Sequence, residues 1–230
     1  MDYGTASGAG ALRRERLRTA RLYFVCDAMP NGDDPEPLLR SALDGGVDII
    51  QLREKSNDRR LIDRAAQTFR RLADTYAVPF LINDDPEIAV QVGADGVHVG
   101  QDDISIEEAR GIVGSEMLIG LSTHSEDQVR SALETGGMDY LSTGPVWETP
   151  TKEGRPATGL DLVSFAARTV PLPFFAIGGI DASTVEDVLQ AGARRLCVVR
   201  AIRDSADPAA TAASLRRAFA SVGSEVAPGG

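Results

Sequence analysis

The fold is decided by a pattern that residues 47–55, VDIIQLREK, show clearly. A short run of Val, Ile and Leu is typical of a strand that is buried on both faces of a parallel sheet. Side chains alternate along a strand, so Gln51, Arg53 and Lys55 share one face. The segment therefore predicts a buried strand whose inner face becomes polar and cationic towards its carboxyl end.

The same pattern recurs about eight times, with amphipathic segments between the apolar runs. The predicted strands are residues 21–27, 47–54, 79–84, 95–101, 117–123, 139–145, 173–179 and 195–201. The predicted helices are residues 35–44, 58–76, 125–136, 160–168, 182–191 and 207–221, with shorter ones near 86–92 and 105–112. Parallel neighbours need a long crossover connection, which these helices supply. The series predicts an α/β fold, a (β/α)8 TIM barrel, with a doubly wound open sheet as the alternative.

The closed barrel is favoured because nearly every polar or unusual residue lies at the carboxyl end of its predicted strand. In a barrel those ends converge on one mouth, where enzymes of this fold place their chemistry. We expect a single barrel domain over residues 21–221, a loosely ordered segment with weak helical character over 1–20, and a flexible tail over 222–230. A short repeat, Gly-Val-Asp or Gly-Ala-Asp, precedes some of the strands.

The composition limits the classes of partner. The 230 residues carry 24 basic and 34 acidic side chains, a formal net charge of −10, which counts against binding to nucleic acid or to an anionic membrane surface. No apolar run is long enough to span a membrane. The two cysteines, Cys26 and Cys197, lack metal-binding spacing and indicate a reducing, cytoplasmic setting. The sequence is compatible with a homo-oligomer and does not decide the oligomeric state.

Lysine is used at only two positions, Lys55 and Lys152, and every other basic residue is arginine. This suggests sites where a compact ammonium group is needed, although two solvated loops would explain the same pattern. Lys152 lies in a long loop, residues 143–156, with Thr149 and Thr151. A loop rich in hydroxyl groups that also carries a lysine predicts a lid that grips phosphate.

Carboxylates follow two neighbouring strands of the predicted barrel. Asn83 and Asp84 close the third strand, and Asp103 follows the fourth. Oxygen ligands without His or Cys suit Mg²⁺ that retains several waters and also binds a substrate phosphate. A simple capping role, for example for Asp103 before the segment that starts near Ser105, remains the alternative.

A second anion site is predicted at the last two strands. Gly178 and Gly179 end the seventh strand and expose backbone N–H groups, while Val199 and Arg200 end the eighth. The loops after these strands form the usual phosphate site of a TIM barrel. Two anion sites in one mouth predict two phosphorylated substrates, the more highly charged of which is held with the metal.

The two histidines, His98 and His124, have no adjacent Ser or Cys nucleophile motif. For His98 we favour a structural, hydrogen-bonded role over a catalytic one. For His124 both roles stay open.

Together these motifs resemble the thiamine phosphate synthase family. The resemblance spans roughly residues 21–205, with the motifs in the expected order at 51–55, 82–84, 96–103, 122–124, 144–152 and 176–180. It implies that hydroxymethylpyrimidine diphosphate is joined to thiazole phosphate with release of pyrophosphate. It also implies a dissociative mechanism, in which the diphosphate leaves with the help of Mg²⁺ before the thiazole nitrogen attacks.

The resemblance further implies roles for individual residues. Those implied to bind the pyrimidine diphosphate are Gln51, Arg53, Lys55, Asn83, His98, Ser122, Thr151 and Lys152, with Arg53, Lys55 and Lys152 as the catalytic ones. Those implied to bind the thiazole phosphate are Thr149, Thr151, Gly179, Val199 and Arg200. Those implied to hold Mg²⁺, the one expected cofactor, are Asp84 and Asp103.

One residue departs from the family pattern. Many relatives carry Ser where this chain has Arg200, and the sequence does not decide whether the arginine side chain or only its backbone meets the phosphate. Two alternative functions stay open. A thiazole tautomerase-like barrel would use an imidazole near His124, and a non-catalytic regulator would bind thiazole or thiamine phosphate without releasing pyrophosphate.

Overall fold

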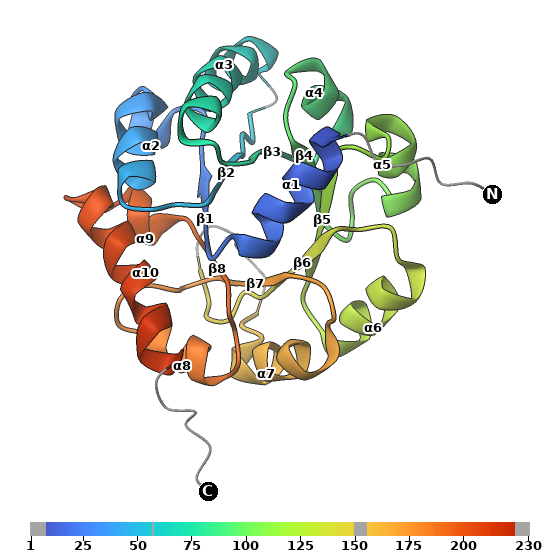
Figure 1. The fold of residues 1–230 in the computed structure, drawn as a ribbon, viewed down its shortest axis with the longest axis vertical. Helices are drawn as coiled ribbons and strands as arrows, with labels where there is room; N and C mark the ends of the chain where they lie inside the picture. The colour runs from blue at the N-terminus through green and yellow to red at the C-terminus, as the bar shows by residue number, and fades with distance from the viewer. Residues whose placement is uncertain (1–7, 57, 150–155, 224–230) are drawn as a thin grey trace, which may run out of the picture.

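A computed structural model describes residues 8–56, 58–149 and 156–223, which form one closed barrel (Figure 1). The strands are β1 (Leu22–Cys26), β2 (Ile49–Leu52), β3 (Phe80–Asn83), β4 (Gly96–Val99), β5 (Leu118–Thr123), β6 (Tyr140–Thr143), β7 (Phe174–Ile177) and β8 (Leu196–Val198). They pair in parallel in chain order, and β8 closes the sheet on β1 through the register of Leu22 with Leu196. The predicted TIM barrel is therefore confirmed, and the open sheet is excluded.

Helices that follow the strands form a ring outside the barrel, whereas the first helix precedes β1 and lies across one end of it (Figure 1). They are α1 (Gly8–Thr19), α2 (Pro35–Asp44), α3 (Arg59–Tyr76), α4 (Pro86–Gln91), α5 (Ile106–Val113), α6 (Glu126–Thr135), α7 (Gly159–Thr169), α8 (Val185–Gln190), α9 (Arg200–Arg203) and α10 (Pro208–Gly223), with a 3₁₀ turn η1 (Pro30–Gly32). Side chains fix where several begin: Asp58 accepts hydrogen bonds from the amides of Arg60 and Leu61 at the start of α3. Among the described residues, no helix has the length and apolar character that crossing a membrane requires.

The strands contribute to two apolar layers. One set of side chains packs outward against the helices, and the alternate set packs inside the barrel, where the rings of Tyr23 and Tyr140 lie edge-on to Phe175 with centroid distances of 5.3 and 5.6 Å. Nearer the carboxyl ends the interior becomes polar, with buried Gln51 and His98. The inward-facing side chains therefore change from apolar to polar towards the carboxyl ends of the strands throughout the barrel, as the sequence of β2 predicts.

Helix α1 corrects one expectation. We expected residues 1–20 to be loosely ordered, but residues 8–19 form a helix that lies across one end of the barrel (Figure 1). Its Leu17 is buried in the interior cluster, and Arg13 and Arg14 form ion pairs of 2.9 and 2.8 Å with Asp95 and Asp139. Local periodicity gave this segment only weak helical character, because the partners that hold the helix lie 82 and 125 residues away along the chain. Residues 1–7 lie outside the described part.

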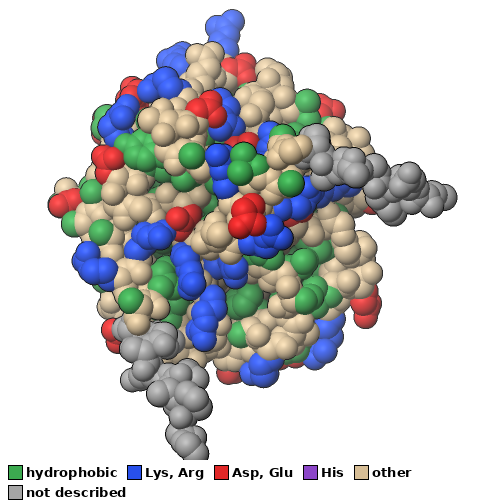
Figure 2. All heavy atoms as spheres, in the orientation of Figure 1, with side chains coloured by type: hydrophobic (Ala, Val, Ile, Leu, Met, Phe, Trp, Pro, Cys, Tyr) green, Lys and Arg blue, Asp and Glu red, His purple; other side chains and the backbone are tan. Residues whose placement is uncertain are grey.

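Asp95 of the short Gly-Ala-Asp repeat and Asp139, which also precedes a strand, hold the starts of strands. Asp95 accepts from Arg13, from Arg70 at 2.7 Å and from the amide of Phe80 at 3.0 Å. Asp139 is bonded in the same way by two arginines and the amide of residue 119. Burial alone would raise the pKa of Asp95, but these donors hold it below its ordinary value. Figure 2 shows acidic and basic side chains interspersed over the face of the molecule on which α1 lies.

The carboxyl terminus needs a smaller correction. The flexible tail was expected over residues 222–230, but α10 continues to Gly223. The rest of that tail, residues 224–230, lies outside the described part.

Candidate active site

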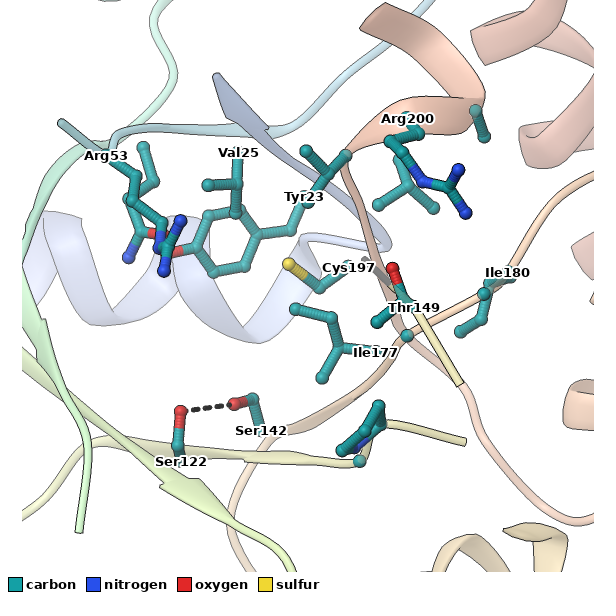
Figure 3. A pocket seen from close by; sticks show the side chains of 18 of the residues that line it. Tyr23, Val25, Arg53, Ser122, Ser142, Thr149, Ile177, Ile180, Cys197 and Arg200 are labelled. Atoms are coloured by element: carbon teal, nitrogen blue, oxygen red, sulfur yellow. Dashed lines mark hydrogen bonds between the residues drawn. The ribbon is translucent and has the colours of Figure 1, made fainter. Parts of the chain in front are cut away.

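A cavity of about 310 Å³ opens at the carboxyl ends of the strands (Figure 3). Its wall contains nine of the predicted site residues: Gln51, Arg53, Asn83, His98, Ser122, Thr149, Gly179, Val199 and Arg200. They come from six strand ends and from the loop after β6. In Figure 3 the side chains of Arg53 and Arg200 lie on opposite sides of this cavity.

Strand β2 supplies two hydrogen-bond donors that the described residues do not use. Gln51 is only 3% exposed, and its Nε2 has no hydrogen-bond partner in the described part of the chain. Arg53 follows β2, where its amide donates to the carbonyl of Cys26 at 3.0 Å, and no described carboxylate pairs with its guanidinium. The neighbouring Glu54 instead accepts from the amide of Ser56 at 2.8 Å. Unused donors in a cavity wall are ready to bind an acceptor on a ligand.

The far wall is a hydrogen-bonded cluster on β4, β5 and β6. The imidazole of His98, 8% exposed, lies 3.0 Å from the Tyr140 hydroxyl through Nδ1 and 3.0 Å from the Ser122 hydroxyl through Nε2. A Cβ at Gly120 would collide with the Tyr140 ring and with Nδ1 of His98, so this contact requires glycine there. His98 thus has the hydrogen-bonded position expected for it, and it also faces the cavity.

The two predicted metal ligands lie beside the cavity. Among the described residues neither Asp84 nor Asp103 forms part of its wall, and both are exposed. Asp84 adopts a left-handed backbone conformation (φ 66°), and its amide donates to the carbonyl of His98 at 2.7 Å. One carboxylate oxygen of Asp103 accepts from the amide of Gly100 at 2.7 Å, which fixes the Asp103 side chain near the end of β4.

Two exposed carboxylates at neighbouring strand ends fit Mg²⁺ by their chemistry, because this ion prefers oxygen ligands and retains several waters. They do not make a complete protein cage. In the described part of the chain no group of three or more His, Cys, Asp or Glu side chains could hold a metal.

The predicted lysines have different outcomes. Lys55 is described and exposed, but it is not among the residues of the cavity wall. Thr151 and Lys152 fall within 150–155, a part of the predicted lid that lies outside the described residues.

The ends of β7 and β8 form the other side of the cavity. Gly178 and Gly179 adopt left-handed conformations with φ of 100° and 69°, and the carbonyl of Gly178 accepts from the amide of Trp147 at 3.1 Å. A Cβ at Gly179 would lie 2.7 Å from that of Trp147, so glycine allows the loop after β6 to pack closely. Arg200 begins α9, is exposed and lines the cavity.

His124 lies apart from this cavity. Its Nδ1 is hydrogen-bonded to the carbonyl of Gly144, and its amide donates to Gln128 at 2.7 Å. It lines a different hollow, with Glu126 and Asp161. The position of His124 therefore gives no support to a reaction at the main cavity that relies on its imidazole.

Sequence reasoning missed several wall residues, among them Tyr23, Ser142 and Cys197. A usable signal existed for Ser142, because it pairs in register with Ser122 on the neighbouring strand. Tyr23 reads as an ordinary core residue until the barrel is closed, since its hydroxyl meets Tyr140 from the opposite side of the interior.

Comparison with known proteins identifies the family. The family model described as thiamine monophosphate synthase matches residues 22–202. The chain belongs to this family. It is 48% identical over 199 residues to the thiamine-phosphate synthase of Thermus thermophilus, which covers 85% of this chain and 95% of that protein. It is 46% identical over 205 residues to the thiamine-phosphate synthase of Thermobifida fusca, which covers 89% of this chain and 94% of that protein.

Solved structures agree with this assignment. Thiamine phosphate pyrophosphorylase from Pyrococcus furiosus superposes with a TM-score of 0.81 at 30% identity, over 91% of this chain and 98% of that chain. A 3-hexulose-6-phosphate synthase superposes with a TM-score of 0.63 at 21% identity, over 86% of this chain and 99% of that chain, which shows a shared fold only.

Proposed function

We propose that the protein is a thiamine-phosphate synthase that joins 4-amino-5-hydroxymethyl-2-methylpyrimidine diphosphate to thiazole phosphate and releases pyrophosphate. Family membership supports the reaction. The observation that carries the proposal is one cavity with the unused donors Gln51 and Arg53 on one side and Arg200 on the other. Such a cavity suits two anionic substrates that meet over a shared centre.

The chemistry needs charge stabilisation more than a base. The bond between the methylene carbon and the diphosphate oxygen breaks, and its electron pair leaves with the diphosphate. The aminopyrimidine stabilises the resulting methylene cation, and the lone pair of the thiazole nitrogen forms the new carbon–nitrogen bond. Because that ring nitrogen carries no hydrogen, no proton has to be removed from it. Preorganised cations, here Arg53, Lys55 and Lys152, stabilise the negative charge that develops on the leaving group.

The pyrimidine diphosphate occupies the β2 to β5 side of the cavity. Gln51 and His98 contact the pyrimidine half, and Arg53, Lys55, Asn83, Ser122, Thr151 and Lys152 bind its diphosphate. The unused amide N–H group of Gln51 supports this orientation, because a ring nitrogen would satisfy a donor that is otherwise buried without a partner.

The thiazole phosphate occupies the β7 to β8 side. Thr149, Thr151, Gly179 and the backbone at Val199 and Arg200 bind it. The exposed guanidinium of Arg200 adds a charge-assisted donor to a site that otherwise relies on backbone groups and hydroxyls.

Magnesium is the proposed cofactor, held by Asp84 and Asp103 together with the substrate diphosphate. Mg²⁺ at this position would neutralise charge on the diphosphate oxygens as the leaving group departs. The two carboxylates lie at the ends of neighbouring strands, on the side of the cavity that carries Arg53.

We place the enzyme in the cytoplasm. Both cysteines are buried thiols without a disulfide, which agrees with a reducing compartment. The partners that we propose are small phosphorylated molecules, with no nucleic acid or membrane and with no role assigned to a second copy of the chain.

The decisive experiment measures pyrophosphate. The full chain is incubated with both substrates and Mg²⁺, and released pyrophosphate is quantified against mixtures that lack one substrate or contain a chelator. Release that depends on both substrates and on Mg²⁺ supports the proposal. Binding of thiazole phosphate without pyrophosphate release would instead support the regulator.

A further inference from the structure

The turn that leads into β8 differs in charge from the turns that lead into β2, β4 and β6. Asp48, Asp95 and Asp139 directly precede those three strands, and each accepts a hydrogen bond from a backbone amide near the start of a neighbouring strand. Before β8 the chain carries Arg194 and Arg195 instead. A place where the barrel elsewhere uses a carboxylate therefore holds two cations.

The guanidinium of Arg195 is half-buried without a counter-charge. Its Nη2 donates to the carbonyl of Arg18, near the end of α1, at 2.8 Å. Its Nε is buried without a hydrogen-bond partner, and in the described part of the chain no carboxylate pairs with this side chain. Burial and the nearby Arg21 lower the pKa of Arg195, because both disfavour the charged form. The contacts of Arg195 within the chain therefore do not offset the cost of holding its charge there.

A second guanidinium, that of Arg21, lies close to the first. Strands β1 and β8 are neighbours, and the amide of Leu196 donates to the carbonyl of Arg21 at 2.8 Å. The Arg21 side chain is exposed, and its Cζ lies 5.7 Å from the centroid of the Phe219 ring on α10. The carboxylate of Asp48 accepts from the backbone amide of Arg21 but forms its ion pair with Arg216. Among the described residues, the Arg21 guanidinium thus also lacks a carboxylate.

A small oxyanion of the phosphate class fits this pair of cations. Guanidinium groups bind phosphate oxygens through charge-assisted hydrogen bonds, and one dianion can neutralise two of them. The formal net charge of −10 opposes a large polyanion such as nucleic acid, whereas a small anion needs only local positive charge. Figure 2 shows basic side chains gathered between α1 and α10 on this face.

We propose that Arg21 and Arg195 form a binding site for a phosphate-type dianion at the amino end of the barrel, opposite the active-site cavity. Neither arginine lines that cavity, so the site does not depend on the proposed function. The ligand is inorganic phosphate or the phosphate group of a small ester, which share this chemistry. Because the bound dianion supplies the missing counter-charge to the folded chain, it raises the stability of the fold.

Thermal unfolding in inorganic phosphate tests the site. The full chain is melted at constant ionic strength while phosphate replaces chloride, so that general screening stays the same. Arg195→Met removes the charge and keeps an unbranched apolar side chain. At several times the dissociation constant, the phosphate-induced rise in melting temperature should be roughly 2–4 °C smaller in Arg195→Met than in the unmodified protein. Arg21→Met should lose a similar part of the rise.

The matched control is Arg64→Met, because Arg64 is an exposed arginine of α3 without an ion pair among the described residues. Its phosphate-induced rise should equal that of the unmodified protein, which includes any contribution from the active-site cavity. An equal rise in the unmodified protein and in Arg195→Met would overturn the proposal. A rise that chloride alone reproduces at the same ionic strength would overturn it as well.

A phosphate ester distinguishes the two sources of the anion. The same melting series is run with glycerol 3-phosphate, a simple monoester, and the part of the rise that depends on Arg195 is compared with that in inorganic phosphate. A larger part at equal concentration identifies a small phosphate ester as the ligand. An equal or smaller part identifies free phosphate. Both results support the site, since both depend on Arg195.

Discussion

The two ends of the barrel use the same kinds of polar side chain in opposite ways. At the amino end, Asp95 and Asp139 each accept from two arginines and one backbone amide, so these arginines are paired with carboxylates. At the carboxyl end, Arg53 has no carboxylate partner among the described residues, and the amide nitrogen of Gln51 has no partner at all there. The contrast teaches that the arginines around Asp95 and Asp139 at the structural end of this barrel are paired with carboxylates, whereas Arg53 at the working end is left for a ligand.

The largest expected effect comes from removing a donor at the working end. Arg53→Ala should lower kcat by about 10²- to 10³-fold, because the proposed function places this cation at the leaving group, while the melting temperature changes little. The measurements are steady-state pyrophosphate release and thermal unfolding. Arg14→Ala, at the opposite end, is the control and should lower stability while kcat stays the same. Equal effects of the two variants on kcat would remove the distinction between the ends.

The next effect concerns stability. Asp95→Ala should lower the free energy of unfolding by about 3 kcal/mol, because Arg13, Arg70 and the Phe80 amide lose a shared acceptor. Denaturant unfolding measures this loss, and kcat per folded molecule should not change. A variant as stable as the parent would show that these ion pairs do not hold the amino end together.

A smaller effect is expected at the phosphate side of the cavity. Arg200→Ser should raise KM for thiazole phosphate about tenfold and leave KM for the pyrimidine diphosphate unchanged, since one charge-assisted hydrogen bond is lost. Arg203→Ser is the matched control on the same helix, because Arg203 pairs with Asp27 and Asp204 instead. An unchanged KM in the Arg200 variant would mean that only the backbone at this position meets the phosphate.

The smallest effect is a pH dependence. The donors around Asp95 hold its folded-state pKa below its ordinary value despite burial, so its ionised form stabilises the fold. That stabilisation is complete above the ordinary pKa and is lost as the pH falls through the lowered one. The difference in unfolding free energy between the parent and Asp95→Asn should therefore shrink in acid. If the difference in unfolding free energy stays constant as the pH falls, the charge of Asp95 does not contribute to stability.

The sequence predicts best where the signal is local. The polar face of β2 followed from alternation within a few residues, and Gln51 and Arg53 do line the cavity. The parallel barrel followed from the regular series of strands and helices. Both depend only on neighbours along the chain.

The sequence predicts poorly where the partners are distant. The hydroxyl of Tyr23 meets that of Tyr140 across 117 residues of sequence, and Arg14 meets Asp139 across 125. No periodicity within one segment contains such pairs, so the ordered helix α1 and the interior hydrogen-bonded chain were not expected. Lys55 lies beyond the end of β2 and is exposed, so the role that alternation assigned to it stays a prediction.

The filled end of the barrel determines how molecules reach the cavity. Leu17 of α1 and the rings of Tyr23, Tyr140 and Phe175 fill the lower barrel, so the mouth is the route of access to the cavity. On the proposed function, both substrates must enter, and both products must leave, through this same opening.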